Sequence, residues 1–202
     1  MKIPDPGPVR AFLDDRHVEL ASEIAGFAEK RIATLPEPPD DTAARAQARA
    51  ILSDLGKGGW LKAIVDQDLR ACCLIRESLA AASPLSDAVF ALQALGTTPI
   101  VMAGSRDLKD RWIPRMIAGQ AMGAFAMTES GAGSDVASLA TSARRNGTDY
   151  VLQGSKTLIS NAGIADFYTV FASTDSTKGS KGISCFVVAA DTPGSNSWAR
   201  RY

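Results

Sequence analysis

The sequence predicts an α+β fold: an N-terminal all-α helical domain followed by a small antiparallel β-barrel-like domain that need not be complete. Apolar residues recur at helical spacing from residue 14 to about residue 120, and short alternating runs replace them after residue 123. A segment containing glycine and serine marks the change. We therefore expect a helical domain over residues 1–121, a β domain over residues 122–194 and a separate tail over residues 195–202.

The helices of the first half are predicted from apolar stripes and from the residues that interrupt them. The stripes are Leu20, Ile24, Phe27 and Ala28, and then Leu69, Cys72, Cys73, Arg76, Leu79 and Ala80. Prolines at 36, 38 and 39 end the first helix, glycines at 56, 58 and 59 end the second, and Ser83-Pro84 begins a later one. Pro114 is expected to kink or restart the last helix.

The strands of the second half are predicted from alternating and β-branched runs. The runs span residues 138–145, 149–153, 157–160, 166–173 and 182–190. Asn146-Gly147 lies between the first two and is typical of a tight hairpin turn. Helices first and strands second predict segregated layers, which excludes a βαβ nucleotide-binding fold.

Composition excludes several classes of function. Lysine plus arginine and aspartate plus glutamate both number 22, and the positive residues are scattered, so we expect no nucleic-acid partner. No run approaches the roughly 20 apolar residues of a membrane span, and Met1 to Pro8 do not form a signal-peptide core. We expect a cytoplasmic protein without a membrane segment.

Cysteine and histidine usage disfavours metal and hydrolytic chemistry. The three cysteines are odd in number and two are adjacent, which fits small buried thiols better than a disulfide framework or a metal site. His17 is the single histidine, so a multi-histidine metal site or a Ser-His-Asp triad is disfavoured. We expect no metal, and we expect His17 on a helix surface.

Residues 125–135, FAMTESGAGSD, are the segment best suited to hold a ligand. Gly131 and Gly133 remove side chains where backbone N–H groups could approach an anion, and Thr128 and two serines add hydroxyl donors. A pyrophosphate would suit such a loop. A Rossmann loop is discarded because Val136 replaces the third glycine and a strand-like run follows. From the residues alone, a plain turn remains the alternative.

Two stretches, AFAMTESGAGSDVASL and DYVLQGSKTLISNAGIADFYTVFAST, resemble the signature and the following β domain of the acyl-CoA dehydrogenase family. The Thr-Glu-x-Gly-x-Gly-Ser-Asp core is a specific signal, and weaker agreement extends from about residue 17 to residue 194. The resemblance implies an N-terminal helical domain, a middle β domain and a C-terminal four-helix bundle, with FAD between the last two. Only the first two are represented here.

The resemblance also implies positions along the cofactor. The implied cofactor-binding residues are Phe125, Met127, Thr128, Gly133, Ser134, Leu158, Ile159 and Ser160. The first three would lie along the flavin ring, where a main-chain amide and the Thr128 hydroxyl could bond its pyrimidine edge. Gly133 and Ser134 would meet the pyrophosphate, and Ser134 would also lie near the CoA portion of the substrate.

The second loop, residues 158–160, would approach the other side of the ring, with the Ser160 hydroxyl near N5. Two positions depart from the family pattern. Leu158 stands where many relatives have tryptophan, which weakens stacking on the flavin, and Ser160 replaces a commoner threonine while keeping the hydroxyl. These departures leave FAD binding intact and leave the substrate range open.

The reaction implied by the resemblance needs a base that this sequence lacks. A carboxylate removes the α-proton of an acyl-CoA thioester while the β-hydrogen leaves as hydride to flavin N5. In the family that base comes from the C-terminal bundle, whereas Glu129 helps to fix the loop, so we expect no catalytic residue here. By analogy the electron acceptor is an electron-transferring flavoprotein, and the full-length family forms homo-oligomers.

Three interpretations remain open. The chain is part of an acyl-CoA dehydrogenase that is inactive alone, or an inactive fragment or degenerate paralogue, or a relative of the same fold such as an acyl-CoA oxidase or a flavin monooxygenase. Residues 195–202 carry neither strand alternation nor the family's onward sequence. A frameshift, a premature stop, an artificial boundary and an ordinary surface terminus would each explain that tail.

Overall fold

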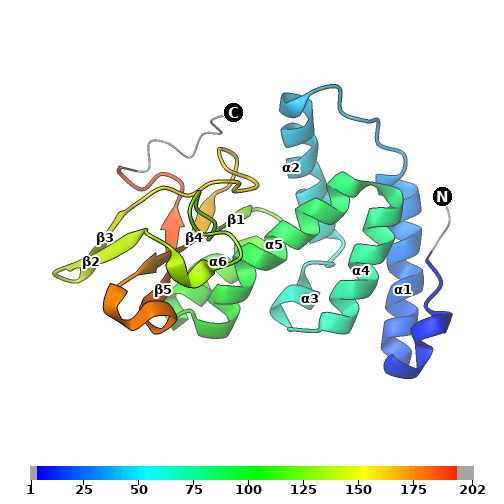
Figure 1. Ribbon diagram of the computed structural model, residues 1–202. Coiled ribbons are helices and arrows are strands. Elements are labelled where there is room, and N and C mark those ends of the chain that lie inside the picture. The colour runs from blue at the N-terminus through cyan, green and yellow to red at the C-terminus, as the bar shows by residue number, and fades with distance from the viewer. Residues whose placement is uncertain (1–3, 195–202) are drawn as a thin grey trace. The chain divides into compact units, whose positions relative to one another are not determined.

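The computed structural model describes residues 4–194 and divides the chain into two compact units, Met1–Met122 and Gly123–Tyr202 (Figure 1). This division falls one residue from the expected domain boundary. The first unit is helical and the second carries a sheet, which confirms the expected α+β class. The expected tail, 195–202, lies outside the described residues.

Helices make up the first unit. They are η1 Gly7–Phe12, α1 Asp15–Phe27, the π-helical turn η2 Ala28–Ile32, α2 Asp41–Lys57, α3 Lys62–Val65, α4 Leu69–Ala82, α5 Pro84–Ala103 and α6 Arg106–Ile117. The proline and glycine clusters lie at the expected helix ends. We expected the helix to kink or restart at Pro114. It does not restart, because α6 continues through this residue as one helix.

The core of the helical unit forms where α1, α4 and α5 pack in sequence; Figure 1 shows α1 and α4 side by side. Ile24, Ile75 and Phe90 are completely buried there. The stripe expected from Leu69 to Ala80 was wrong except at Leu79, because the buried face of α4 carries Ala71, Leu74, Ile75, Ser78 and Leu79. The buried face carries the large apolar side chains of Leu74 and Ile75, whereas Leu69, in the first turn of the helix, is 74% exposed.

The α5 helix is long and apolar enough, by length and composition alone, to cross a membrane. A core helix passes the same test, and α5 places Val89, Phe90 and Ile100 in the core of the unit. From the sequence we expected no apolar run close to the length of a membrane span. That expectation missed this helix. Its apolar character follows from packing on both α4 and α6.

The expected buried thiols and the expected surface histidine were wrong. Cys73 and Cys185 are exposed and Cys72 is half-buried. His17 is only 1% exposed, because its ring fills the space between α1 and the start of α4 and bonds polar groups of both segments. A buried imidazole needs such partners, and they come from residues far apart in the sequence.

A five-stranded sheet forms the described part of the second unit. Its strands are β1 Gly123–Ala126, β2 Ser142–Asn146, β3 Asp149–Gln153, β4 Phe167–Ser173 and β5 Ile183–Ala189, with the short 3-10 helices η3 Val136–Ser138 and η4 Ser176–Gly182 between them. The strand β4 is central: β5 pairs antiparallel along its whole length, β1 pairs parallel with its first half, and β2 reaches its end at Ser173.

The sheet is mixed and open, so the expected antiparallel character holds for β2 with β3 and for β4 with β5, but not for β1. The hairpin at Asn146-Gly147 is present, and Gly147 has the positive φ that such a turn requires. The strand expected at 157–160 was wrong. Leu158 and Asn161 have φ of 56° and 65°, which a pleated strand cannot contain, and the Asn161 side chain bonds the Gly123 carbonyl.

Candidate functional site

The turn after β1 is closed by its own backbone. The Glu129 and Ala132 main chains exchange two hydrogen bonds, of 3.1 and 3.2 Å, so residues 129–132 form a tight turn. Ala132 points into the unit, whereas Gly131 and Gly133 are exposed. A Cβ added at either glycine would meet nothing within 4 Å. The turn therefore has a packed inner side and an open glycine side.

The Glu129 carboxylate holds this turn against the start of β2. Its Oε2 accepts a bond from the Ala140 amide at 2.6 Å, and Oε1 accepts from the Thr141 amide at 3.0 Å and from the Thr141 hydroxyl at 2.5 Å. The expected strand from residue 138 was wrong at its beginning for this reason. The amides of residues 140 and 141 bond a carboxylate instead of a neighbouring strand.

Lys156 completes the coordination of the carboxylate. Its Nζ lies 2.7 Å from Glu129 Oε1 and 3.0 Å from the Met127 carbonyl oxygen, and only 5% of its side chain is exposed. One residue further on, the Thr157 amide donates to the Thr128 carbonyl at 2.9 Å. These bonds join the turn after β1 to the segment that leads to Leu158.

Electrostatics keep Glu129 ionised. Burial alone would raise the pKa of this carboxyl, but the hydrogen bonds from Lys156, Thr141 and the Ala140 amide outweigh it and lower the pKa to about 2. A carboxylate that accepts four bonds and has this pKa cannot take a proton near neutral pH. Glu129 therefore serves as an anchor of the loop, and its exclusion as the base stays a prediction.

The sequence-predicted residues gather on these two joined loops. Phe125, in β1, is half-buried and its ring packs 5.0 Å from that of Phe171. Met127 and Thr128 are half-buried, and Gly133 and Ser134 are exposed on the open side of the turn. Hydrogen bonds between residues 127–129 and 156–157 bring this group next to the second predicted group, residues 158–160.

The second group does not present all its side chains in the same way. Leu158 is 87% exposed and Ser160 is exposed as well. The side chain of Ile159 instead packs against a core cluster that includes Ala126 and Tyr168. Ile159 is therefore only partly exposed, between two exposed neighbours.

Sequence reasoning missed Lys156, Thr141 and Gly154 as parts of the site. Gly154 comes so close to Thr141 that a Cβ there would lie 2.4 Å from the Thr141 hydroxyl oxygen. A lysine between two polar residues is ordinarily solvated, and nothing local indicates that its amine meets a carboxylate 27 residues earlier. Only the placement of the two loops on one sheet reveals the pair.

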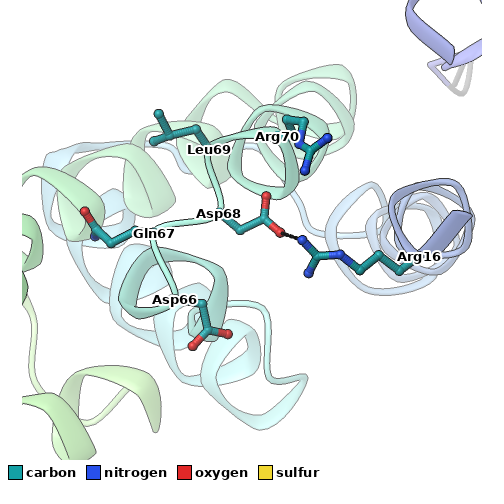
Figure 2. Close-up of a pocket in the computed structure, with 6 residues that line it drawn as sticks. All are labelled: Arg16, Asp66, Gln67, Asp68, Leu69 and Arg70. Atoms are coloured by element: carbon teal, nitrogen blue, oxygen red, sulfur yellow. Dashed lines mark ion pairs between the residues drawn. The ribbon is translucent and has the colours of Figure 1, made fainter. Parts of the chain in front are cut away.

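A surface depression of about 400 Å³ lies in the helical unit, where α4 begins, whereas the predicted residues belong to the sheet unit. Figure 2 shows Arg16 and Asp68 facing each other across it, with Arg70 nearby. Arg16 pairs with Asp68 at 2.7 Å, and Arg70 pairs with Asp14 at 3.0 Å. Because its cations are engaged by the protein's own carboxylates, this depression is a poor candidate for a ligand site.

Comparison with known proteins identifies the class of protein that has this fold and this loop. The family model described as "Acyl-CoA dehydrogenase, N-terminal domain" matches residues 14–120, and "Acyl-CoA dehydrogenase, middle domain" matches residues 124–201. The chain belongs to the acyl-CoA dehydrogenase family. The middle-domain match continues beyond residue 194, through most of the segment expected to be a tail outside the family.

Individual relatives agree. The probable acyl-CoA dehydrogenase fadE25 of Mycobacterium leprae (strain TN) is 37% identical over 190 residues, which cover 90% of this chain and 48% of the relative. The solved acyl-CoA dehydrogenase from Geobacillus kaustophilus is 30% identical with a TM-score of 0.75, over 91% of this chain and 50% of that one. The chain thus spans about half the length of these relatives.

A further solved structure carries a cofactor in its name. The glutaryl-CoA dehydrogenase from Mycobacterium smegmatis in complex with FADH2 is 29% identical with a TM-score of 0.71, over 92% of this chain and 48% of that one. The families and names of the relatives support a flavin-dependent oxidoreductase lineage for this chain.

Proposed function

We propose that this chain supplies the FAD-facing and thioester-facing portion of an enzyme that dehydrogenates an acyl-CoA between its α and β carbons. The observation that carries this proposal is the pair of loops, 127–134 and 156–160, which are bonded to each other on their inner side and open on the other. The relatives named acyl-CoA dehydrogenase support the reaction class.

The residues present fit a flavin. Leu158 combines 87% exposure with a φ of 56°, so the backbone is held in an unfavourable region while a large apolar side chain faces outward. A flat, largely apolar ring would cover such a side chain. The exposed Gly131 and Gly133 leave room for a pyrophosphate to approach backbone amides, as an anion requires.

Under this proposal, each group keeps the role that the family resemblance gives it. Phe125, Met127 and Thr128 lie along one flank of the ring, and Leu158, Ile159 and the Ser160 hydroxyl approach the other. Gly133 and Ser134 take the pyrophosphate, and Ser134 also meets the CoA portion of the substrate. Bound FAD would accept the hydride, while the chain's residues bind and orient it.

The proton-abstracting group must come from elsewhere, because Glu129 is fully engaged by Thr141, Ala140 and Lys156. We assign it to the part of the relatives' length that this chain does not cover. An electron-transferring flavoprotein is the proposed electron acceptor and homo-oligomerisation is proposed for the complete enzyme. The cytoplasmic location expected from the sequence stays a prediction.

An NMR titration of the 202-residue chain with FAD tests the cofactor proposal even if binding is weak. The expected result is a saturable shift of the backbone amide signals of Thr128, Gly133, Ser134 and Leu158. Thr128→Val, which keeps the shape and removes the hydroxyl, should weaken binding by about fivefold to tenfold, as the loss of one hydrogen bond predicts. Shifts that appear only elsewhere, or none near saturating FAD, would contradict the proposal.

A separate measurement distinguishes the alternatives. A preparation that includes the remaining length of a relative and whose flavin is bleached by acyl-CoA is a dehydrogenase or an oxidase. Rapid reaction of the reduced flavin with oxygen would then favour the oxidase or monooxygenase interpretation. Binding of FAD without any acyl-CoA response would favour the inactive fragment or paralogue.

A further inference from the structure

Lys156 is a buried cation whose cost must be explained. Its side chain is 5% exposed and the side chain of its partner Glu129 is 8% exposed, with 2.7 Å between Nζ and Oε1. Removing both charges from water costs about as much as their attraction returns, so a buried pair contributes little net stability. Such pairs are better explained by the arrangement that they enforce.

The arrangement enforced here is the direction of one peptide group. Lys156 Nζ donates to the Met127 carbonyl oxygen at 3.0 Å. No peptide bond in the described residues is cis. In a trans peptide the C=O and the following N–H point in opposite directions, so a carbonyl held toward the buried amine turns the Thr128 N–H away from it. The amide of Thr128 therefore faces away from the packed inner side of the loop.

The same amine also sets the spacing of the two loops. Lys156 lies two residues before Leu158, and its neighbour Thr157 donates to the carbonyl of Thr128 at 2.9 Å. Two bonds from consecutive residues, 156 and 157, thus reach two consecutive carbonyls, those of 127 and 128. This ladder fixes the exposed Leu158 relative to the Thr128 amide.

We propose that Lys156 is a positioning residue for the flavin: it aims the Thr128 N–H and holds the Leu158 loop beside it, while Glu129 neutralises its charge. The inference rests on the proposed function, because it assigns the aimed amide to the cofactor. Lys156 touches neither cofactor nor substrate, and its effect passes through the Met127–Thr128 peptide.

Two variants separate positioning from stability. Lys156→Met keeps the apolar stem and removes the amine, but it leaves the Glu129 charge buried without its cation. The double variant Lys156→Met with Glu129→Gln removes that charge as well, so its melting temperature should return toward the native value. The Met127 carbonyl still lacks its donor in the double variant, so the orientation of the Met127–Thr128 peptide is no longer fixed.

The first measurement needs no cofactor. In the cofactor-free chain, hydrogen exchange of the Thr157 amide should accelerate and the amide signal of Thr128 should shift in both Lys156 variants. Lys178→Met is the matched control, because Lys178 also pairs with a carboxylate, that of Asp175, at 2.9 Å, but is 66% exposed. The control should leave both signals unchanged. Unchanged signals in the Lys156 variants would overturn the positioning role.

The second measurement uses the FAD titration. The double variant should bind FAD about tenfold more weakly than the native chain, as expected for losing one well-aimed hydrogen bond, and Lys156→Arg should recover part of the loss. If the native chain binds FAD and the double variant binds it equally well, the positioning role of Lys156 is overturned and the proposed function is not. Failure of the native chain to bind FAD would overturn the proposed function and, with it, the assignment of the amide to a flavin.

Discussion

At the scale of single residues, the two carboxylates with informative surroundings are Glu129 and Asp68. Both are surrounded by donors, and in each case hydrogen bonds overcome the cost of burial and lower the pKa of the carboxyl. Glu129 ties the β-domain turn to two other segments, and Asp68 caps α4 through the Ala71 amide at 3.1 Å. Both of these carboxylates therefore hold segments of the chain together.

The lowered pKa of Glu129 predicts an acid sensitivity of definite sign. Because the pKa is about 2 in the folded chain and 4.5 ordinarily, its contribution is complete above about pH 5 and is lost as the pH falls toward 2. The native chain should therefore lose about 2 kcal/mol more unfolding free energy than Glu129→Gln between about pH 6 and about pH 3. Urea unfolding at the two pH values measures this difference.

The control for that experiment is Glu19→Gln, on the exposed face of α1. It removes one carboxyl without touching the loop, so it should keep the native pH dependence. Equal pH dependence in the native chain and in Glu129→Gln would mean that the Glu129 carboxylate does not carry the bonds described above.

At the scale of elements, His17 joins two helix starts. Its Nδ1 accepts from the Asp14 amide at 3.1 Å, at the N-terminus of α1, and its Nε2 lies 3.1 Å from the carboxylate of Asp68, the N-cap of α4. With Nδ1 accepting, Nε2 is the ring nitrogen that faces the Asp68 carboxylate. One buried side chain thus satisfies groups at two helix ends, and it also sets where α1 meets α4.

Replacing His17 should therefore cost more than replacing its exposed neighbour. His17→Ala removes two partly buried hydrogen bonds of a buried ring and leaves Asp68 with one donor fewer, with an expected loss of about 2–3 kcal/mol in unfolding free energy. Arg16→Ala removes a pair in which the arginine is 67% exposed, and should cost less than about 1 kcal/mol. Urea denaturation followed by helical circular dichroism compares them, and equal losses would contradict the described geometry.

Element prediction from the sequence succeeded where local signals decide. Prolines and glycines ended the helices, and Asn146-Gly147 placed the β2–β3 hairpin, because φ constraints act within a few residues. Prediction failed where a distant partner decides. The amides of residues 140 and 141 are taken by Glu129, and the loop 157–160 is bent by bonds from Lys156 and Asn161.

The candidate site follows the same division. Gly131 and Gly133 signal an open turn from composition alone, and the family motif names the neighbouring residues. Ile159 looked equivalent to its neighbours in sequence, yet its side chain is partly buried and packs against the sheet core. Which of the three residues 158–160 is partly buried depends on the direction in which the loop turns. The positive φ of Leu158 cannot be predicted from the residue type or from the periodicity of apolar residues.

At the scale of the whole molecule, the chain contributes one wall of the proposed site. The loops 127–134 and 156–160 both belong to the sheet unit, and the exposed Leu158 has no protein cover within that unit's described residues. A cofactor resting on one wall keeps much of its surface in water, whereas tight sites bury most of the ligand. We therefore expect residues 1–202 to bind FAD weakly.

The last prediction follows from that exposure. The purified 202-residue chain should be colourless, and acyl-CoA should not bleach FAD added to it, because Leu158 is 87% exposed and the proposed function assigns the proton acceptor to the part of the relatives that this chain does not cover. A chimera that continues into the second half of the Geobacillus kaustophilus relative, which this chain does not cover, should retain flavin under the proposed function, because we expect the added half to form the second wall of the site. Visible absorbance per mole of protein measures both. Stoichiometric flavin in the short chain would mean that these two loops alone enclose the ring, and the one-wall account would be wrong.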